Sequence, residues 1–508
     1  MPRRCAPTLP PAAAVQAASP LLQLPAEILA VVLARLDTRY LARLASTCRL
    51  CRDAPTPPPP PHAIGAVESE LRRRAEARGL DVGSSLPEGL TSWVACLLKR
   101  DRRDAQMRQA PLAVGHEHSM FVDTQGRLLT CGSDSRVEPV LGHAMNPAAD
   151  LNIPREIGPP TPVPPMQDRR IVSVATSHSH CLALSADGEV YSWGSGRVGE
   201  LGYGNAGIRA VPIRIESLSS IERIAVGRNC TSAAVDEKGR LFTWGRASFI
   251  VEFEGEYGEL RESEGPCGLG YELDAETVWQ ATPKQVDALS QDRVVCVALG
   301  FDFTLAVNDA GAVFSFGSSW VGGLGHGLSD VEVLPRRIEA LTQTRRRFVA
   351  VAAGDVHALA LTEEGELYGW GYRYANGHGR EERTPQLVAA LIGQCVKLVN
   401  AHWWCSCAVT EKGELFTWSA ASAEGAEGNL GHEGSQGTPT RVAGLRGVEV
   451  VAVAISGTHT LVADADGVVW AFGRRSALGL GASGPADSAA VPTPTPIPTL
   501  RARVLNSP

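Results

Sequence analysis

Residues 180–194 read HCLALSADGEVYSWG, two short apolar segments on either side of Ala186-Asp187-Gly188. Two strands joined by an Asp-Gly turn form a β-hairpin, because glycine readily adopts the positive φ that a tight turn requires. Trp193 follows Gly188 by five residues, and a glycine comes directly after it. Neither side of the second strand carries a charge, which is typical of a strand buried on both faces.

The same spacing of five residues between a turn glycine and an aromatic residue, or its substitute, recurs seven times after residue 110. The pairs are Gly126/Cys131, Gly188/Trp193, Gly239/Trp244, Gly311/Phe316, Gly365/Trp370, Gly413/Trp418 and Gly467/Phe472. The first and last glycines lie 341 residues apart over six intervals, a mean period of about 57. A repeat of roughly this length indicates a propeller or a solenoid.

A third element, proline followed three and six residues later by a branched apolar residue and leucine, precedes most of these hairpins. The copies are Pro212/Ile215/Leu218, Pro283/Val286/Leu289, Pro335/Ile338/Leu341, Pro385/Val388/Leu391, Pro439/Val442/Leu445 and, after the last hairpin, Pro494/Ile497/Leu500. Proline suits an edge strand, where it removes no ladder hydrogen bond. Because the first hairpin lacks this element and the C-terminus carries a copy, we expect the C-terminal strand to complete the first blade and close a ring of seven.

These segments resemble the regulator of chromosome condensation repeat. Val-Ala-x-Gly-x-x-His, Asp-Gly-x-Val-Tyr-Ser-Trp-Gly and Leu-Gly-Tyr-Gly carry the resemblance, with Leu201–Gly204 and Leu324–Gly327 as the clearest copies of the last motif. The resemblance covers about residues 112–504 and implies an all-β, seven-bladed β-propeller, assigned here to residues 111–504. Cys131 replaces the aromatic residue of the first repeat, and Ser419 replaces the glycine of the sixth.

Residues 21–54 are predicted to form a small helical module, because Leu29, Val32, Leu33 and Leu36 recur at helical spacing. The sequence Leu24-Pro25-Ala26-Glu27-Ile28-Leu29 resembles the start of an F-box, although Pro55–Pro61 interrupt its usual third helix. The resemblance implies docking on a Skp-type adaptor, and through it on a cullin–RING ubiquitin ligase, by Leu24, Pro25, Glu27, Ile28, Leu29, Leu33 and Leu36. The alternative is a two-helix element that packs on the propeller.

Composition and charge narrow the classes of partner and the cellular compartment that the chain can have. Residues 1–110 hold 16 Lys and Arg against 10 Asp and Glu, and the rest of the chain holds 32 against 45. An acidic propeller is a poor partner for nucleic acid, and no apolar run is long enough to span a bilayer. Residues 1–20 are predicted to be disordered, and residues 55–110 to be a proline-rich linker with helices. Twelve scattered cysteines indicate reduced thiols, and hence the cytoplasm or nucleus.

The sequence contains no pattern typical of an enzyme, so we expect no catalytic, cofactor-binding or metal-binding residues. No nucleotide-binding, metalloprotease or hydrolase motif occurs. His118, His180, His357 and His459 occupy one position of the repeat, which predicts a structural hydrogen bond across the turn.

Two departures from the repeat are candidate target-binding surfaces. An insertion after Trp244 contains Phe249, Glu252, Phe253, Glu254, Glu256, Tyr257 and Glu259, which could bind a basic segment of a partner or form a solvated loop. Trp403 and Trp404 replace the usual turn before a strand. They are either a binding hot spot or packing between blades.

The resemblances together predict a substrate-recognition adaptor of a Skp-cullin-F-box ubiquitin ligase. A first alternative is guanine-nucleotide exchange on a Ran-like small GTPase, with the insertion after Trp244 as a wedge. A second is a non-catalytic interaction scaffold. An ultraviolet-sensing role, known for a plant photoreceptor with these repeats, is disfavoured because the ten tryptophans are dispersed.

Overall fold

The computed structural model describes residues 110–134, 138–144, 155–254, 260–273, 278–319, 321–328, 331–419, 428–432, 437–480 and 490–503. For residues 155, 249–254, 260–265 and 499 it describes the backbone alone. The chain divides into two compact units, residues 1–104 and 105–508, and the elements below belong to the second. No helix within the described ranges is long and apolar enough to cross a membrane.

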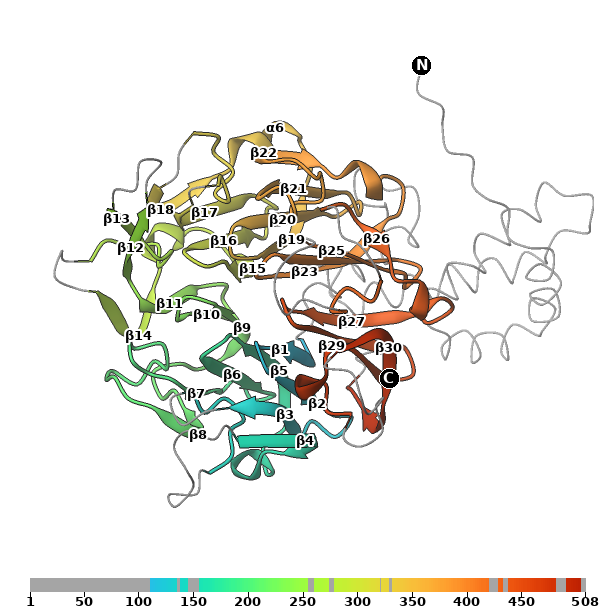
Figure 1. Cartoon of the computed structure of the whole chain (residues 1–508). Coiled ribbons are helices and arrows are strands. Elements are labelled where there is room, and N and C mark those ends of the chain that lie inside the picture. Colours follow the sequence, from blue (N-terminus) through green and yellow to red (C-terminus); the bar gives the residue numbers. More distant parts are fainter. Residues whose placement is uncertain are drawn as a thin grey trace, which may run out of the picture. The chain divides into compact units, whose positions relative to one another are not determined.

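Seven four-stranded antiparallel sheets form the blades of a propeller (Figure 1). The innermost strands are β1 (Leu112–Val114), β5 (Ile171–Thr176), β9 (Ile221–Gly227), β15 (Val294–Leu299), β19 (Phe348–Ala353), β23 (Val396–His402) and β27 (Val450–Ile455). The second strands are β2 (His118–Val122), β6 (His180–Ser185), β10 (Thr231–Asp236), β16 (Phe303–Asn308), β20 (His357–Thr362), β24 (Cys405–Thr410) and β28 (His459–Asp464). The predicted seven-bladed all-β fold is therefore confirmed.

Each predicted hairpin consists of a second and a third strand. The third strands are β3 (Leu128–Asp134), β7 (Val190–Gly194), β11 (Leu241–Arg246), β17 (Val313–Ser318), β21 (Leu367–Gly371), β25 (Leu415–Ser419) and β29 (Val468–Arg474). The outer strands are β4 (Arg155–Pro162), β8 (Arg209–Arg214), β14 (Trp279–Gln285), β18 (Val331–Arg337), β22 (Glu382–Leu387), β26 (Thr440–Arg441) and β30 (Ala490–Arg501). Short helices accompany them: η1 (Pro164–Met166), η2 (Asp287–Leu289), α6 (Glu339–Gln343), η3 (Ala389–Leu391), η4 (Ala443–Leu445) and η5 (Arg475–Ala477).

The hydrophobic core lies between the blades. Every residue of the second strands is buried, because neighbouring sheets cover both of their faces. The repeated tryptophans are fully buried there, and each indole N–H donates to a backbone carbonyl of the preceding blade, as Trp244 Nε1 does to Glu200 O at 2.9 Å. The invariant spacing of five residues thus places one large anchor at each of these interfaces.

The C-terminal strand does not complete the first blade, so this expectation was wrong. β30 pairs with β29 of its own blade, and β4 is the outer strand of the first blade. Each proline element forms the outer strand region of the blade that precedes it in sequence, not of the blade whose hairpin follows it. The first hairpin therefore has no such element before it. Its seventh copy, Pro160/Val163/Met166, escapes the sequence pattern because methionine replaces leucine, although Val163 and Met166 are as buried as their counterparts.

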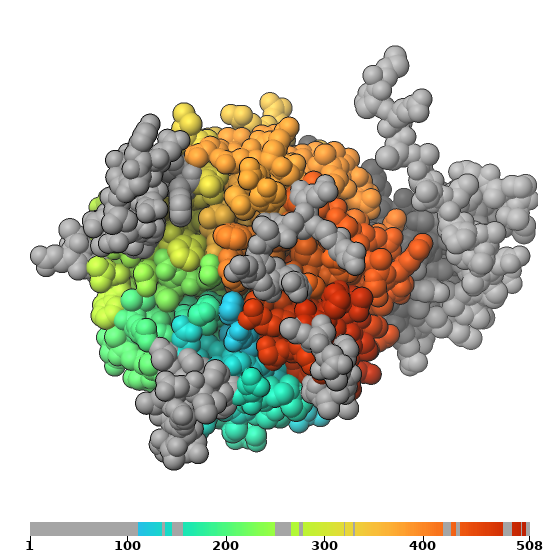
Figure 2. Space-filling model, in the orientation of Figure 1, coloured from blue at the N-terminus to red at the C-terminus, as the bar shows by residue number. Residues whose placement is uncertain are grey.

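Side-chain packing and a few backbone bonds close the ring instead. One core cluster combines Leu112 and Phe121 of blade 1 with Leu461 and Ile497 of blade 7. Beyond β30, the Arg503 amide donates to Val122 O at 2.9 Å. Figure 2 shows the result, with blade 1 in blue directly beside blade 7 in red.

The insertion after Trp244 forms a separate two-stranded antiparallel ribbon, β12 (Ser248–Glu254) paired with β13 (Leu260–Pro266). It leaves blade 3 between β11 and β14, the third and outer strands of that sheet. The ribbon therefore interrupts the repeat without disturbing the blade.

Candidate functional site

The turns between the first and second strands of the seven blades gather at one mouth of the central channel. A cavity of about 280 Å³ in this channel is lined by residues from all seven inner strands. The cavity exists because small side chains line it. Ala175, Ala298 and Ala352 occupy equivalent positions on their inner strands, and Asn400 occupies the same position on β23. The seven turns bring residues far apart in sequence together around the axis.

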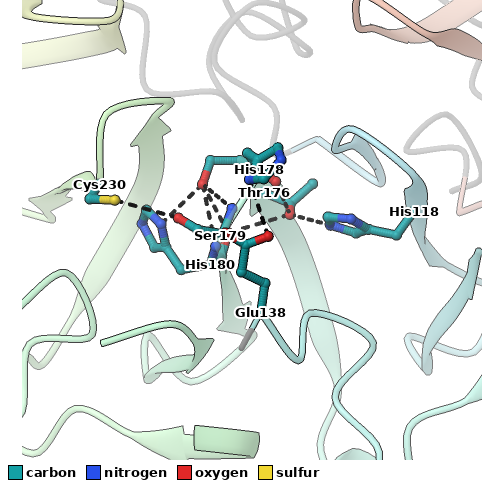
Figure 3. Close-up of polar contacts among 8 residues, drawn as sticks. His118, Glu138, Thr176, His178, Ser179, His180 and Cys230 are labelled. Atoms are coloured by element: carbon teal, nitrogen blue, oxygen red, sulfur yellow. Dashed lines mark hydrogen bonds and ion pairs between the residues drawn. The ribbon is translucent and has the colours of Figure 1, made fainter. Parts of the chain in front are cut away.

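The repeated histidines join neighbouring blades, and His180 and His459 also bond across their own turns, whereas Nδ1 of His357 has no partner among the described residues. His180 Nδ1 lies 3.0 Å from Ser177 Oγ across its turn, as predicted, and its Nε2 lies 2.8 Å from Ser232 Oγ of the next blade. Figure 3 shows this turn with its neighbours. His459 makes the equivalent contact to Ser119 at 2.8 Å, which joins blade 7 to blade 1. Burial lowers the pKa of each of these two histidines to about 3, so both are neutral structural groups.

Six aromatic rings form a continuous row across the channel mouth. Their successive centroids lie 5.6, 6.1, 6.0, 5.8 and 5.2 Å apart. All six residues are half-buried. We call this row the aromatic belt, and its members in order are Tyr374, Tyr372, Trp404, Trp403, His116 and His178. The belt runs from blade 5 through blades 6 and 1 to blade 2, so it crosses the mouth.

Trp403 is held at the centre of the belt by contacts from other blades. Its φ is 54°, a conformation that is uncommon for a bulky residue. The Arg228 guanidinium lies 4.4 Å from the indole centroid and pairs with the Asp355 carboxylate. The Asp355 amide donates in turn to Trp403 O at 2.8 Å. Gly457 leaves room for the ring, since a Cβ there would lie 2.1 Å from it.

Charged side chains flank the belt and are largely paired with one another. Arg474 lies 2.6 Å from Glu117, and His178 lies 3.4 Å from Glu138 (Figure 3). The hydrogen bond from His178 is the main cause that holds the pKa of Glu138 below its ordinary value. Arg373 lies 4.6 Å from the Tyr374 ring centroid. No group of three acidic, histidine or cysteine side chains within the described ranges could hold a metal ion.

Comparisons with known families agree with this architecture. The model of the regulator of chromosome condensation (RCC1) repeat matches residues 187–234, 310–361 and 412–463, and a second model of that repeat matches residues 171–200 and 348–380. The F-box domain model matches residues 21–59. The chain is an F-box protein with RCC1 repeats. The predicted adaptor-binding residues, Leu24 to Leu36, fall within the F-box match and lie outside the described residues.

Relatives share the RCC1 repeats over part of their length. The ultraviolet-B receptor UVR8 of Arabidopsis thaliana is 33% identical over 279 residues, which are 54% of this chain and 57% of that receptor. The human E3 ubiquitin-protein ligase HERC2 is 37% identical over 300 residues, 57% of this chain and 6% of HERC2. The chain therefore matches little more than half of the first relative and a small part of the second.

Two solved structures share the fold. Human WBSCR16 has a TM-score of 0.57 at 18% identity, covering 72% of this chain and 92% of its own. Prp20p of Saccharomyces cerevisiae has a TM-score of 0.57 at 21% identity, covering 78% and 89%. At these identities the likeness shows the propeller fold alone.

The structure separates the two candidate target-binding surfaces. Phe249, Glu252, Phe253 and Glu254 lie on β12, of which the side chains are not described, and Glu256, Tyr257 and Glu259 lie outside the described residues. Trp403 and Trp404 lie in the belt, half-buried, whereas the tryptophans that pack between blades are fully buried.

Sequence reasoning missed His116, His178, Arg228, Tyr372 and Tyr374. The first three lie in the turns between the first and second strands of their blades. Each occupies the first variable position (x) after the glycine position in the motif Val-Ala-x-Gly-x-x-His. A motif defined by its constant residues hides these variable positions. Reading the variable residues as a set would have brought out a concentration of aromatic and charged side chains.

The neighbouring turn of blade 4 carries a carboxyl group that gives the site a testable pH dependence. Asp302 is 3% exposed, and Asn229 Nδ2 donates to it at 2.6 Å. Burial raises its pKa from 3.8 to about 7. Between these values the unfolded chain releases a proton that the folded chain keeps, so stability falls as the pH rises.

We expect Asp302→Asn to remove this dependence. Relative to the variant, the free energy of unfolding of the wild type should fall by up to about 1.4 kcal/mol per pH unit between pH 4 and 7. Urea unfolding at several pH values measures the difference. Parallel pH profiles for the two proteins would contradict the assignment.

Proposed function

We propose that this F-box protein is the substrate-recognition subunit of a Skp-cullin-F-box ubiquitin ligase and itself performs no catalysis. The F-box match at residues 21–59, in one chain with an RCC1-repeat propeller, is the observation that carries the proposal. An F-box links to an adaptor, and a propeller presents a broad surface with variable turns for a target. The chain would thus bring a bound protein to the ligase.

The aromatic belt is the surface that we assign to the target. Binding hot spots are enriched in Trp, Tyr and Arg, and the belt combines Trp403 and Trp404 with Tyr372, Tyr374 and the stacked Arg228. Contacts between blades fix Trp403 in advance, which reduces the entropy lost on binding. These features support recognition of a protein surface.

Adaptor binding tests the proposal directly. The triple variant Leu24→Ala/Pro25→Ala/Ile28→Ala should weaken binding to a purified Skp-type adaptor by about 100-fold or more, because it removes three apolar contacts expected at the centre of the interface. Isothermal titration calorimetry with the full chain measures the effect.

The sequence offers a matched control for this experiment. Leu86-Pro87 repeats the Leu-Pro pair outside the F-box match, so Leu86→Ala/Pro87→Ala/Leu90→Ala likewise removes one proline and two branched apolar side chains. This control should bind the adaptor as the wild type does. No binding by the wild type, or equal losses in both triple variants, would refute the proposed ligase function.

Guanine-nucleotide exchange is the second candidate, and the β12–β13 ribbon favours it. The ribbon leaves blade 3 and its strand β13 lies beside β17 and β18 of blade 4, and from there it could enter a GTPase as a wedge. The crystal structure of Prp20p, which shares the fold, was described with its binding to Gsp1p and histones. Release of nucleotide from a Ran-like GTPase that is stimulated by this chain, and lost when residues 249–265 are replaced by a short Gly-Ser turn, would favour exchange over ligase recruitment.

A further inference from the structure

The hydrogen-bond donors of the belt's tryptophans and tyrosines have no partner among the described residues. Within the described ranges, neither the indole N–H groups of Trp403 and Trp404 nor the hydroxyls of Tyr372 and Tyr374 make a hydrogen bond; their contacts are ring to ring or ring to cation. The buried tryptophans differ, because each donates to a carbonyl, as Trp418 does to Ala375 O at 2.8 Å. The belt therefore has four side-chain donors without a partner among the described residues, on half-buried rings.

The charges around the belt favour a partner without net charge. The two arginines nearest its centre are already neutralised, Arg228 by Asp355 and Arg474 by Glu117. Arg373, at one end, stacks on Tyr374. A charged ligand would have to break these pairs or lose its own hydration without compensation. The complementary ligand is neutral, stacks on aromatic rings and offers hydrogen-bond acceptors.

We propose that the aromatic belt binds a proline-rich segment in the polyproline II conformation. Such a segment has no internal hydrogen bonds, so its carbonyls are free to accept from indole and phenol donors. Its proline rings give flat apolar surface for stacking, and its stiffness limits the entropy lost on docking. Because Trp403 spans the channel mouth, the segment lies across the belt and does not enter the channel.

This inference rests on the proposed function only in calling the segment part of a target. The belt belongs to the propeller alone, and decaproline binding can be measured without an adaptor. A failure here would leave adaptor binding by the F-box intact, and a failure of adaptor binding would leave the belt's ligand unchanged.

Calorimetric titration of the full chain with an acetylated, amidated decaproline peptide tests the inference. The wild type should bind decaproline and should not bind a Gly-Ser peptide of equal length. Trp404→Ala should weaken binding by about tenfold or more, since it removes both a ring and a donor. Trp404→Phe keeps a ring and loses the donor, so its affinity for decaproline should lie between the affinities of the wild type and of Trp404→Ala.

Trp279 provides the matched control, because it is an exposed tryptophan, 37% accessible, on the outer strand of blade 3. Trp279→Ala should bind decaproline as the wild type does. Four results would overturn the inference: no binding at millimolar peptide, equal losses in Trp404→Ala and Trp279→Ala, wild-type affinity in Trp404→Phe, or tighter binding of an acidic or basic decapeptide. Self-association of the chain that Trp404→Ala abolishes, with no decaproline binding, would assign the belt to a second copy and also overturn it.

Discussion

Replacing Trp370 with alanine should lower the free energy of unfolding by about 3–5 kcal/mol, the usual cost of removing a fully buried large aromatic side chain. Trp370 has 0% exposure at the interface between blades 4 and 5. Its Nε1–H donates to Gly323 O at 2.8 Å, so the substitution leaves both a cavity and an unpaired buried carbonyl. Urea unfolding followed by circular dichroism measures the change.

Trp370→Phe separates packing from hydrogen bonding. Phe316 and Phe472 occupy the same repeat position in blades 4 and 7, so the interface accommodates phenylalanine. This variant should cost about 1–2 kcal/mol, mainly from the lost donor to Gly323 O. Equal destabilisation by alanine and phenylalanine would show that ring packing contributes little at this interface.

Gly317→Ala should destabilise the propeller by about 3 kcal/mol or more. Gly317 has a φ of 112°, which side-chain-bearing residues rarely adopt, and a Cβ there would lie 2.2 Å from Asp302 O. The strand end and the inner turn of blade 4 approach too closely for a methyl group. Because Gly317 contributes no side chain to the belt, the loss should appear in the free energy of unfolding, which urea unfolding followed by circular dichroism measures.

Ser419 of blade 6 provides the matched control for Gly317. It occupies the same repeat position, but its φ is not positive. Its hydroxyl accepts from the Cys405 thiol at 3.2 Å. Ser419→Gly should therefore change the free energy of unfolding by about 1 kcal/mol or less. A similar response of the two positions to substitution would contradict the backbone difference between the blades.

The blade number and the buried anchors could be predicted because they depend on local spacing. A hairpin with a fixed five-residue interval, such as Gly188/Trp193, places its aromatic residue at the same point of every sheet. Burial on both faces then follows from uncharged strands. The manner of closure could not be predicted, because Met166 obscured one repeat and the proline element was assigned to the wrong neighbouring hairpin.

The site was predictable only in part. The unusual turn at Trp403 and Trp404 marked it, since a departure from a repeat is visible in sequence. Their partners were missed because His116 and Arg228 lie at variable positions of the repeat, and because His116, Arg228 and Tyr372 belong to three other blades whose contacts with Trp403 and Trp404 depend on the closed ring.

The sequence by itself determined the repeat, the seven blades and the F-box resemblance, since each depends on residues close together in the chain. Only the tertiary structure decided that Arg228, Asp355 and Trp403 meet over the channel. The physical reason is circular closure. A ring brings equivalent turns of all blades to one axis, so contacts between them depend on how blades pack around that axis and not on their separation in sequence.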